Sequence, residues 1–299
     1  MKSRVVAAVG LTVLMSASVA TAQAVGQAPP PTTSPGGSAF TRTDQAREEE
    51  RIARLHGDAV LTPAEIRAAA TASLAAAGVA CQVQDATNPG RSGADRIIEV
   101  SCLDAPGLLV VTSSPPQVLN CLSLDVSAAS GVTPSVLCAL PANKDPVAAV
   151  RGYARTLGLN CTVDAAAWTG RIGADSDRYE IGCARAEGYW VEVDSRGTPT
   201  RKLECLEVAR AGASCRFTTA EEQAATLKAR FEGTAAAPCD VTRARFVGAN
   251  ADYRFYEAAC RGDEGLIARF KPDGAFDEGY PCADAANIAG GCTLGRPED

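Results

Sequence analysis

The stretch EVSCLDAPGLL at residues 99–109 recurs as EIGCARAEGYW at residues 180–190 and as EAACRGDEGLI at residues 257–267. Each copy contains a glutamate, two residues, a cysteine, four residues, a glycine and two apolar residues. Three copies without a gap inside one chain indicate that a structural unit has been duplicated.

The twelve cysteines confirm the period of this duplication, because they fall into three sets of four. The first cysteines of successive sets are 80 and 78 residues apart. The sets are Cys81, Cys102, Cys121 and Cys138; Cys161, Cys183, Cys205 and Cys215; and Cys239, Cys260, Cys282 and Cys292. Even sets at regular spacing are typical of a disulfide framework in an exported protein. Metal-binding cysteines usually form close pairs such as C-x2-C, which this sequence lacks, so we expect no metal site.

The N-terminus has the features of a secretory signal peptide, which we predict for residues 1–24. Lys2 and Arg4 precede the apolar stretch Val5–Met15, and small residues follow it. This stretch is too short to span a bilayer, which takes about 20 apolar residues, and no second run of spanning length follows. We therefore expect a periplasmic or secreted location and no membrane span.

The remaining chain divides into a linker and three repeats. Residues 25–57 are predicted to form a flexible linker that includes a charged helical segment at Asp44–Leu55. The first repeat covers residues 58–140, the second 141–216 and the third 217–299. The net charge of −6 disfavours nucleic acid and anionic lipid as partners, because both attract cationic surfaces.

Each repeat opens with a helix signal. Thr62-Pro63-Ala64-Glu65 is a capping box with proline at the first helical position, Asp145 precedes Pro146, and Thr219 precedes Glu222 by three residues. The motif around each second cysteine then alternates in the manner of β-strands. We predict an α+β fold of three tandem, disulfide-stapled repeats, each a helix packed on an antiparallel meander of three or four strands.

The strand order predicts the disulfides. The first cysteine of each repeat begins strand one and the second ends strand two, so the two lie opposite each other in a hairpin, within disulfide reach. The other two cysteines would close a tail loop. Four cysteines allow three pairings, and we favour Cys81–Cys102, Cys121–Cys138, Cys161–Cys183, Cys205–Cys215, Cys239–Cys260 and Cys282–Cys292. Bridges of this loop length contribute roughly 3 kcal/mol each in the chain-entropy model.

The motif glutamates Glu99, Glu180 and Glu257 are the only repeated candidates for carboxylate chemistry. The alternation places them on the outer, solvent-facing side of each sheet, together with Trp190, Ile267 and Arg269. Their alternative role is structural, as strand carboxylates paired with a basic neighbour such as Arg269. We therefore assign no catalytic residue.

Other catalytic machinery is absent from the sequence. His56 is the one histidine, so sites that need two or three histidines are excluded, and no nucleophile elbow accompanies it. Phosphate-binding and dinucleotide-binding glycine loops are also absent, and we expect no cofactor. We interpret His56 as a solvated surface residue.

Two tryptophans are the candidate binding residues. Trp168 lies in the predicted hairpin turn of the second repeat and Trp190 on its outer face, and exposed tryptophans are common interface anchors. The alternative is that Trp190 fills the seam between repeats.

The capped helices and the strand segments Ile98–Val111, Tyr179–Val193 and Tyr256–Phe270 resemble PepSY domains and beta-lactamase-inhibitor-type tandem repeats in outline. The four-cysteine framework departs from PepSY. The resemblance implies a protein-binding or inhibitory role outside the cytoplasm, and it transfers no functional residues.

We therefore expect an exported, non-catalytic binding or interaction protein, inhibitor-like, whose partner is a protein or a cell-envelope component. The alternatives are a carboxylate-dependent hydrolase of envelope glycans and a structural spacer of the cell envelope.

Overall fold

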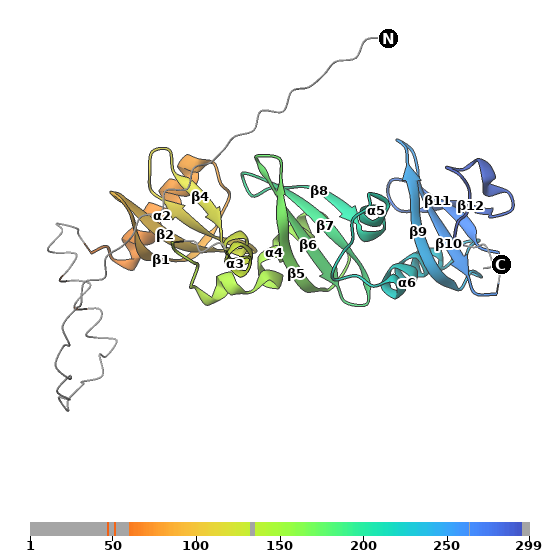
Figure 1. Cartoon of the computed structure of the whole chain (residues 1–299), viewed down its shortest axis with the longest axis horizontal. Helices are drawn as coiled ribbons and strands as arrows, with labels where there is room; N and C mark the ends of the chain where they lie inside the picture. Colours follow the sequence, from red (N-terminus) through yellow and green to blue (C-terminus); the bar gives the residue numbers. More distant parts are fainter. Residues whose placement is uncertain (1–46, 48–50, 52–59, 132–134, 263, 295–299) are drawn as a thin grey trace, which may run out of the picture. The chain divides into compact units, whose positions relative to one another are not determined.

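Three four-stranded antiparallel sheets follow one another along the chain, and each is preceded by one main helix (Figure 1). The computed structural model describes residues 47, 51, 60–131, 135–262 and 264–294. The predicted signal peptide, His56 and most of the predicted linker lie outside the described residues. Within the charged segment, Arg47 and Arg51 are helical and exposed.

The elements of the three repeats correspond closely. The first contains α2 (Pro63–Ala77), β1 (Val83–Ser92), β2 (Asp95–Cys102), β3 (Ala105–Val111), β4 (Gln117–Asn120) and α3 (Cys121–Ala129). The second contains η1 (Pro141–Lys144), α4 (Pro146–Thr156), β5 (Val163–Ile172), β6 (Ser176–Cys183), β7 (Ala186–Asp194), β8 (Pro199–Glu204) and α5 (Cys205–Arg210). The third contains α6 (Ala220–Phe231), β9 (Val241–Ala249), β10 (Arg254–Cys260), β11 (Leu266–Phe270), β12 (Phe276–Pro281) and η2 (Ala285–Asn287). Each sheet keeps its strands in sequence order, so the predicted α+β meander is confirmed.

The main helices begin where the sequence places them. Thr62 and Glu65 form a capping box at α2, and Thr219 and Glu222 form one at α6. The Asp145 side chain accepts a hydrogen bond from the amide of Ala148 at the start of α4. These contacts satisfy amide groups that have no partner within the helix.

Six disulfides staple the sheets, and they join the six predicted pairs. Within each first hairpin, the residue two positions after the first cysteine pairs with the second cysteine, as Val83 does with Cys102. The joined Cα atoms are 5.0 to 5.8 Å apart, which matches ordinary disulfide geometry.

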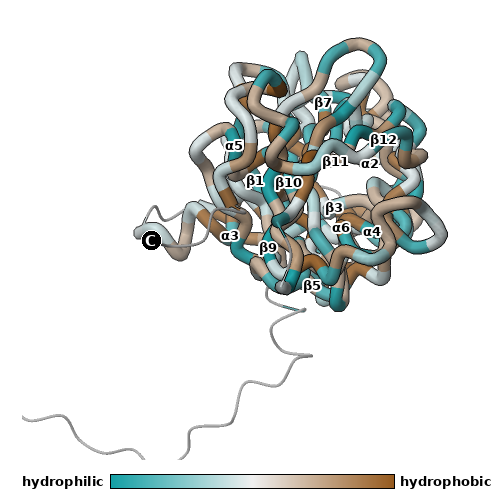
Figure 2. The backbone as a smooth tube through the Cα atoms, turned by 90° about the vertical axis from the view of Figure 1, so that its right-hand side faces the viewer, coloured by the Kyte–Doolittle hydropathy of each residue, from teal (hydrophilic) through white to brown (hydrophobic). Residues whose placement is uncertain are grey.

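One face of each sheet packs against the main helix. In the first repeat, Ala70 and Leu74 of α2 pack on Ile98, Val100 and Val110. The corresponding clusters of the second and third repeats place α4 and α6 against larger cores with aromatic residues. In Figure 2 several projecting loops are hydrophilic, whereas hydrophobic stretches lie further inside.

The opposite face is not exposed to solvent, contrary to the sequence prediction. The segment after each fourth strand folds back over it, carrying the third and fourth cysteines. Leu109 is buried there with Cys121 and Cys138, and Ile267 is buried with Cys292. Ile267, predicted to face outward, is therefore completely buried.

Two tail helices, which the sequence did not reveal, carry contacts between neighbouring repeats. Leu122 of α3 belongs to the core that contains Tyr153 of α4. Leu206 of α5 belongs to the core that contains Phe231 of α6. The first and second repeats thus each place a leucine, directly after the third cysteine, in the hydrophobic core of the next repeat.

The motif glycine makes room for the chain that enters the next repeat. A Cβ on Gly107 would lie 1.9 Å from Oδ1 of Asn143. A Cβ on Gly188 would lie 2.4 Å from the carbonyl oxygen of Ile181 and 2.7 Å from Oγ1 of Thr218. These approaches are far below van der Waals contact, so a side chain at either position would displace the linking segment and, at Gly188, the neighbouring strand as well.

We expect Leu206→Ala to destabilise the protein by about 2–5 kcal/mol, the usual cost of removing a buried leucine. Because Leu206 packs in the core of the third repeat, hydrogen exchange should accelerate in α6 and β10 as well as in α5. Leu203→Ala, at a half-buried neighbouring position, is the control. Faster exchange confined to the second repeat would contradict this assignment.

Candidate functional site

The three motif glutamates are buried, and this corrects the prediction that they face water. Glu99, Glu180 and Glu257 are 1%, 1% and 0% exposed. Each accepts hydrogen bonds from the two backbone amides that directly follow the fourth cysteine of its repeat. The three carboxylates therefore fix the tail segments to their sheets.

In the first repeat both oxygens of Glu99 are occupied. The amide of Ala139 donates to Oε2 at 2.8 Å, and the amide of Leu140 donates to Oε1 at 2.8 Å. Asn143 adds a third bond from Nδ2 to Oε1 at 2.8 Å. A carboxylate bound in this way has no free oxygen for proton transfer.

Glu257 also has a basic partner, but not the one expected. Nε of Arg245 donates to Oε2 of Glu257 at 2.8 Å. Arg269 instead pairs with Asp277 and Glu278 on β12. Arg269 is half-buried, with Tyr253 and Tyr280 stacked near its guanidinium.

Two of these glutamates lie close to cysteine sulfurs, namely Glu99 near Cys121 and Cys138, and Glu257 near Cys282 and Cys292. A cysteine binds a metal ion as the thiolate, whereas these cysteine sulfurs form disulfides. The donor set is therefore unsuited to a metal.

Both tryptophans have hydrogen-bond partners within the second repeat. Nε1 of Trp168 donates to Oδ1 of Asp177 at 2.9 Å, and the ring packs against the second core. Nε1 of Trp190 donates to Oε2 of Glu180 at 3.4 Å, and the Arg178 guanidinium lies 4.5 Å from its ring centroid. Both rings are half-buried, and their role as partner contacts stays a prediction.

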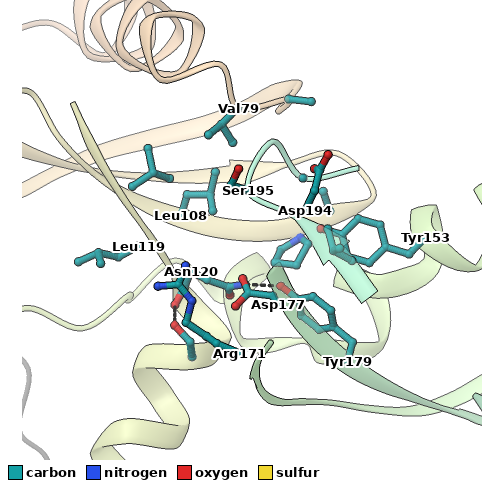
Figure 3. Close-up of a pocket in the computed structure, with 17 residues that line it drawn as sticks. Val79, Leu108, Leu119, Asn120, Tyr153, Arg171, Asp177, Tyr179, Asp194 and Ser195 are labelled. Carbon is teal, nitrogen blue, oxygen red and sulfur yellow. Dashed lines mark hydrogen bonds between the residues drawn. The ribbon is translucent and has the colours of Figure 1, made fainter. Parts of the chain in front are cut away.

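Asp177, the partner of Trp168, lies in a cleft where the first and second repeats meet (Figure 3). We call it the first cleft, and its volume is about 180 Å³. The first repeat supplies Asn120 and Ser123 from the end of β4 and the start of α3. The second repeat supplies Tyr153, Asp177 and Tyr179.

Asn120 organises this cleft because it uses both ends of its side-chain amide. Its Oδ1 accepts from the amide of Leu122 at 2.9 Å and thereby caps α3. Its Nδ2 donates to the hydroxyl of Tyr179 and to Oδ2 of Asp177, the latter at 3.3 Å. One side chain thus joins the tail helix of the first repeat to the sheet of the second.

The phenols in the first cleft stay protonated. Burial raises the pKa of Tyr153 well above its ordinary value, and the negative charge of Asp177 raises it further. Burial likewise raises the pKa of Tyr179, with Tyr153 and Asp177 adding to the effect. Both groups are therefore neutral hydrogen-bonding groups at physiological pH.

A hairpin of the second repeat closes one side of the cleft. The amide of Ala80 donates to the carbonyl of Arg196 at 2.7 Å. Asp194 shapes this turn, because its Oδ1 accepts from the amides of Arg196 and Thr198. Asp194 and Ser195 also line the cleft (Figure 3).

The second and third repeats meet at a corresponding cavity of about 320 Å³, the second cleft. Glu204 precedes the third cysteine as Asn120 does, and Tyr256 takes the position of Tyr179. Here the hydroxyl of Tyr256 donates to Glu204, which also pairs with Arg230 at 2.9 Å and Arg254 at 3.1 Å. Burial alone would raise the pKa of Glu204, but Arg230, the Tyr256 hydroxyl and Arg254 together lower it.

Glu187 lies beside this cluster, is 2% exposed, and has Arg230 at 3.9 Å from its Oε2. Its Oε1 accepts from the amide of Leu206 at 2.6 Å, whereas its buried Oε2 has no hydrogen-bond partner. Burial, followed by the charge of Glu204, raises the pKa of Glu187 to about 8. Glu187 is therefore mostly protonated at neutral pH.

No protein-family model matches this chain, and no curated protein or solved structure matches it significantly. The likeness to PepSY and beta-lactamase-inhibitor-type repeats accordingly rests on the helix-and-meander outline alone. The sequence did not single out Asn120, Asp177 or Glu187, because nothing in their local pattern distinguishes them from surface residues.

We expect Glu99→Gln to lower the free energy of unfolding by roughly 2–4 kcal/mol. An amide places an NH2 group against one of the backbone donors in either orientation and leaves buried donors unsatisfied. Chemical denaturation measures the loss, and hydrogen exchange at residues 139 and 140 localises it. Glu221→Gln, at an exposed helix position, removes the same charge, and an equal effect of both variants would contradict the proposed tail contact.

Glu187 should make stability fall as pH rises. Because its pKa in the folded state exceeds that of an ordinary glutamate, its stabilising contribution is complete below the unfolded pKa and is lost as pH rises through about 8. At about 1.4 kcal/mol per pKa unit, wild type should lose roughly 3–5 kcal/mol relative to Glu187→Gln between about pH 5 and pH 9. Denaturation curves across this range test the expectation, and parallel profiles for the two proteins would refute it.

Proposed function

We propose that the mature chain is an exported, non-catalytic, inhibitor-like binding protein whose partner is a protein or another component of the cell envelope. The first repeat would carry the contact surface. The six disulfides fit a protein that folds in an oxidising compartment. In the part of the chain that the structure describes, no helix is both long enough and apolar enough to cross a bilayer.

The observation that carries the proposal is the distribution of exposed apolar side chains. Among the described residues, none of the five large hydrophobic side chains that are exposed lies in the second or the third repeat. They are Val60, Leu103, Leu119, Val126 and Leu137. Exposed apolar side chains that form one patch commonly mark an interaction site, and we propose that three of these five do so.

Three of these side chains, one in β4 and two in the tail of the first repeat, define what we call the tail surface. Leu119, Val126 and Leu137 are 45%, 40% and 42% exposed. Leu119 also lines the first cleft, so the tail surface extends to the rim of that cavity. An apolar surface beside a polar cleft suits a partner that presents both kinds of group.

The glycan-hydrolase alternative has less support. It requires two carboxyl groups facing each other across one cleft. The repeated glutamates on which it was based lie in three different sheets and bind backbone amides, so they do not form such a pair. The spacer alternative offers no reason why, in the described part of the chain, the exposed leucines all lie in the first repeat.

We expect the double substitution Leu119→Ser and Leu137→Ser to weaken partner capture at least tenfold. The immobilised mature protein and its variant would be compared in a pull-down from envelope extract, with mass spectrometry identifying what only the wild type retains. Both side chains are exposed, so the unfolding transition should stay unchanged.

Leu103→Ser is the matched control, because Leu103 is equally exposed but lies in the turn between β2 and β3. Equal capture by wild type and the double variant would refute the tail surface. Release of sugars from envelope glycans by the mature protein would refute a non-catalytic role.

A further inference from the structure

The two clefts occupy equivalent places but differ in charge. Asn120, Ser123, Asp177 and Tyr179 of the first cleft correspond to Glu204, Glu207, Arg254 and Tyr256 of the second, because each pair lies at the same distance from its repeat cysteines. The eleventh residue of the main helix is Thr156 in α4 and Arg230 in α6. Of the two arginine positions of the second cleft, one is therefore an aspartate in the first cleft, and the other is Thr156, which does not line that cleft.

The second cleft contains its own guanidinium groups. Arg230 lies 2.9 Å from Oε1 of Glu204 and 5.3 Å from the ring centroid of Tyr256. Arg254 lies 3.1 Å from Oε2 of the same glutamate and 3.0 Å from Glu207. The carboxylate, phenol and guanidinium groups of the second cleft are thus paired with one another within the chain.

The first cleft has a carboxylate, phenols and one arginine, Arg171, but that arginine forms no ion pair with Asp177, its cross-strand neighbour, among the residues that the structure describes. Asp177 accepts only from uncharged donors, the indole of Trp168 and the amide of Asn120, and it forms no ion pair among the residues that the structure describes. Arg171 also lines this cleft, but its guanidinium donates to the carbonyl of Ala174 in its own hairpin. Asp194 adds a second carboxylate to the lining.

We propose that the first cleft binds a guanidinium group, supplied by an arginine side chain of the partner. This inference rests on the proposed function and names the chemistry that the partner presents beside the tail surface. A planar guanidinium can donate two hydrogen bonds to the carboxylate of Asp177 and lie against a tyrosine ring. Ser123 and Ser195 supply hydroxyl acceptors in the same cavity.

The two tryptophans provide a direct test by NMR. The indole NH of Trp168 is hydrogen-bonded to Asp177, whereas that of Trp190 is hydrogen-bonded to Glu180. Titration with N-acetyl-arginine N-methylamide should move the Trp168 indole resonance saturably and leave that of Trp190 in place. The citrulline analogue, nearly identical in shape but neutral, should move neither, and the lysine analogue should bind at least fivefold more weakly.

Three variants locate the site. Asp177→Asn retains an oxygen acceptor for the Trp168 indole and should weaken arginine binding at least tenfold. Asp175→Asn, an exposed carboxylate in the same hairpin, should change binding less than twofold. Arg171→Gln removes a like charge from the lining and should strengthen binding severalfold.

Equal responses to the arginine and citrulline analogues, or unchanged binding by Asp177→Asn, would overturn the proposal. Equal binding of the lysine analogue would overturn the guanidinium preference. Partner capture separates this failure from failure of the proposed function: if capture depends on Leu119 and Leu137 but is unaffected by Asp177→Asn, the binding role stands and the guanidinium site does not.

Discussion

The hydrogen bonds between each motif glutamate and the amides after the fourth cysteine are the constraint on which the rest of the structure depends. A single antiparallel sheet with one helix would leave one face to solvent. Glu99, Glu180 and Glu257 accept the amides of the tail segments, so each tail covers that second face. In the first two repeats the tail that covers this face also carries the helix whose leucine packs in the core of the next repeat.

The polar contacts between repeats differ according to the position of each repeat in the chain. The residue before the third cysteine forms a hydrogen bond with a tyrosine of the following sheet: Asn120 donates to the hydroxyl of Tyr179, and Glu204 accepts from the hydroxyl of Tyr256. The third repeat has Pro281 in this position, which cannot offer a side-chain hydrogen bond. The first repeat has Ile98 where the others have tyrosine. The polar pair therefore occurs only where two repeats of the described chain meet.

Much of the fold followed from the sequence, because cysteine spacing and strand alternation report directly on hairpin geometry. Alternation divides a strand into two faces, however, and does not reveal which face meets solvent. The alternation therefore predicts that Glu99 faces solvent, although a tail loop closed by two cysteines must pack against some surface. The first cleft could not be foreseen, because Asn120 and Asp177 come from different repeats and meet only through packing between α3 and the second sheet.

The contrast between the two clefts argues for divergence of one junction into two roles. Arg230 and Arg254 balance the negative charge of Glu204, so the second cleft requires no ligand to neutralise that carboxylate. These half-buried ion pairs join the second repeat to the third. The first cleft keeps the tyrosine and the polar residue that caps the tail helix, but it has Asp177 in place of an arginine. Since duplication supplies two equivalent positions, the molecule can use one as a rigid joint and leave the other open to a partner.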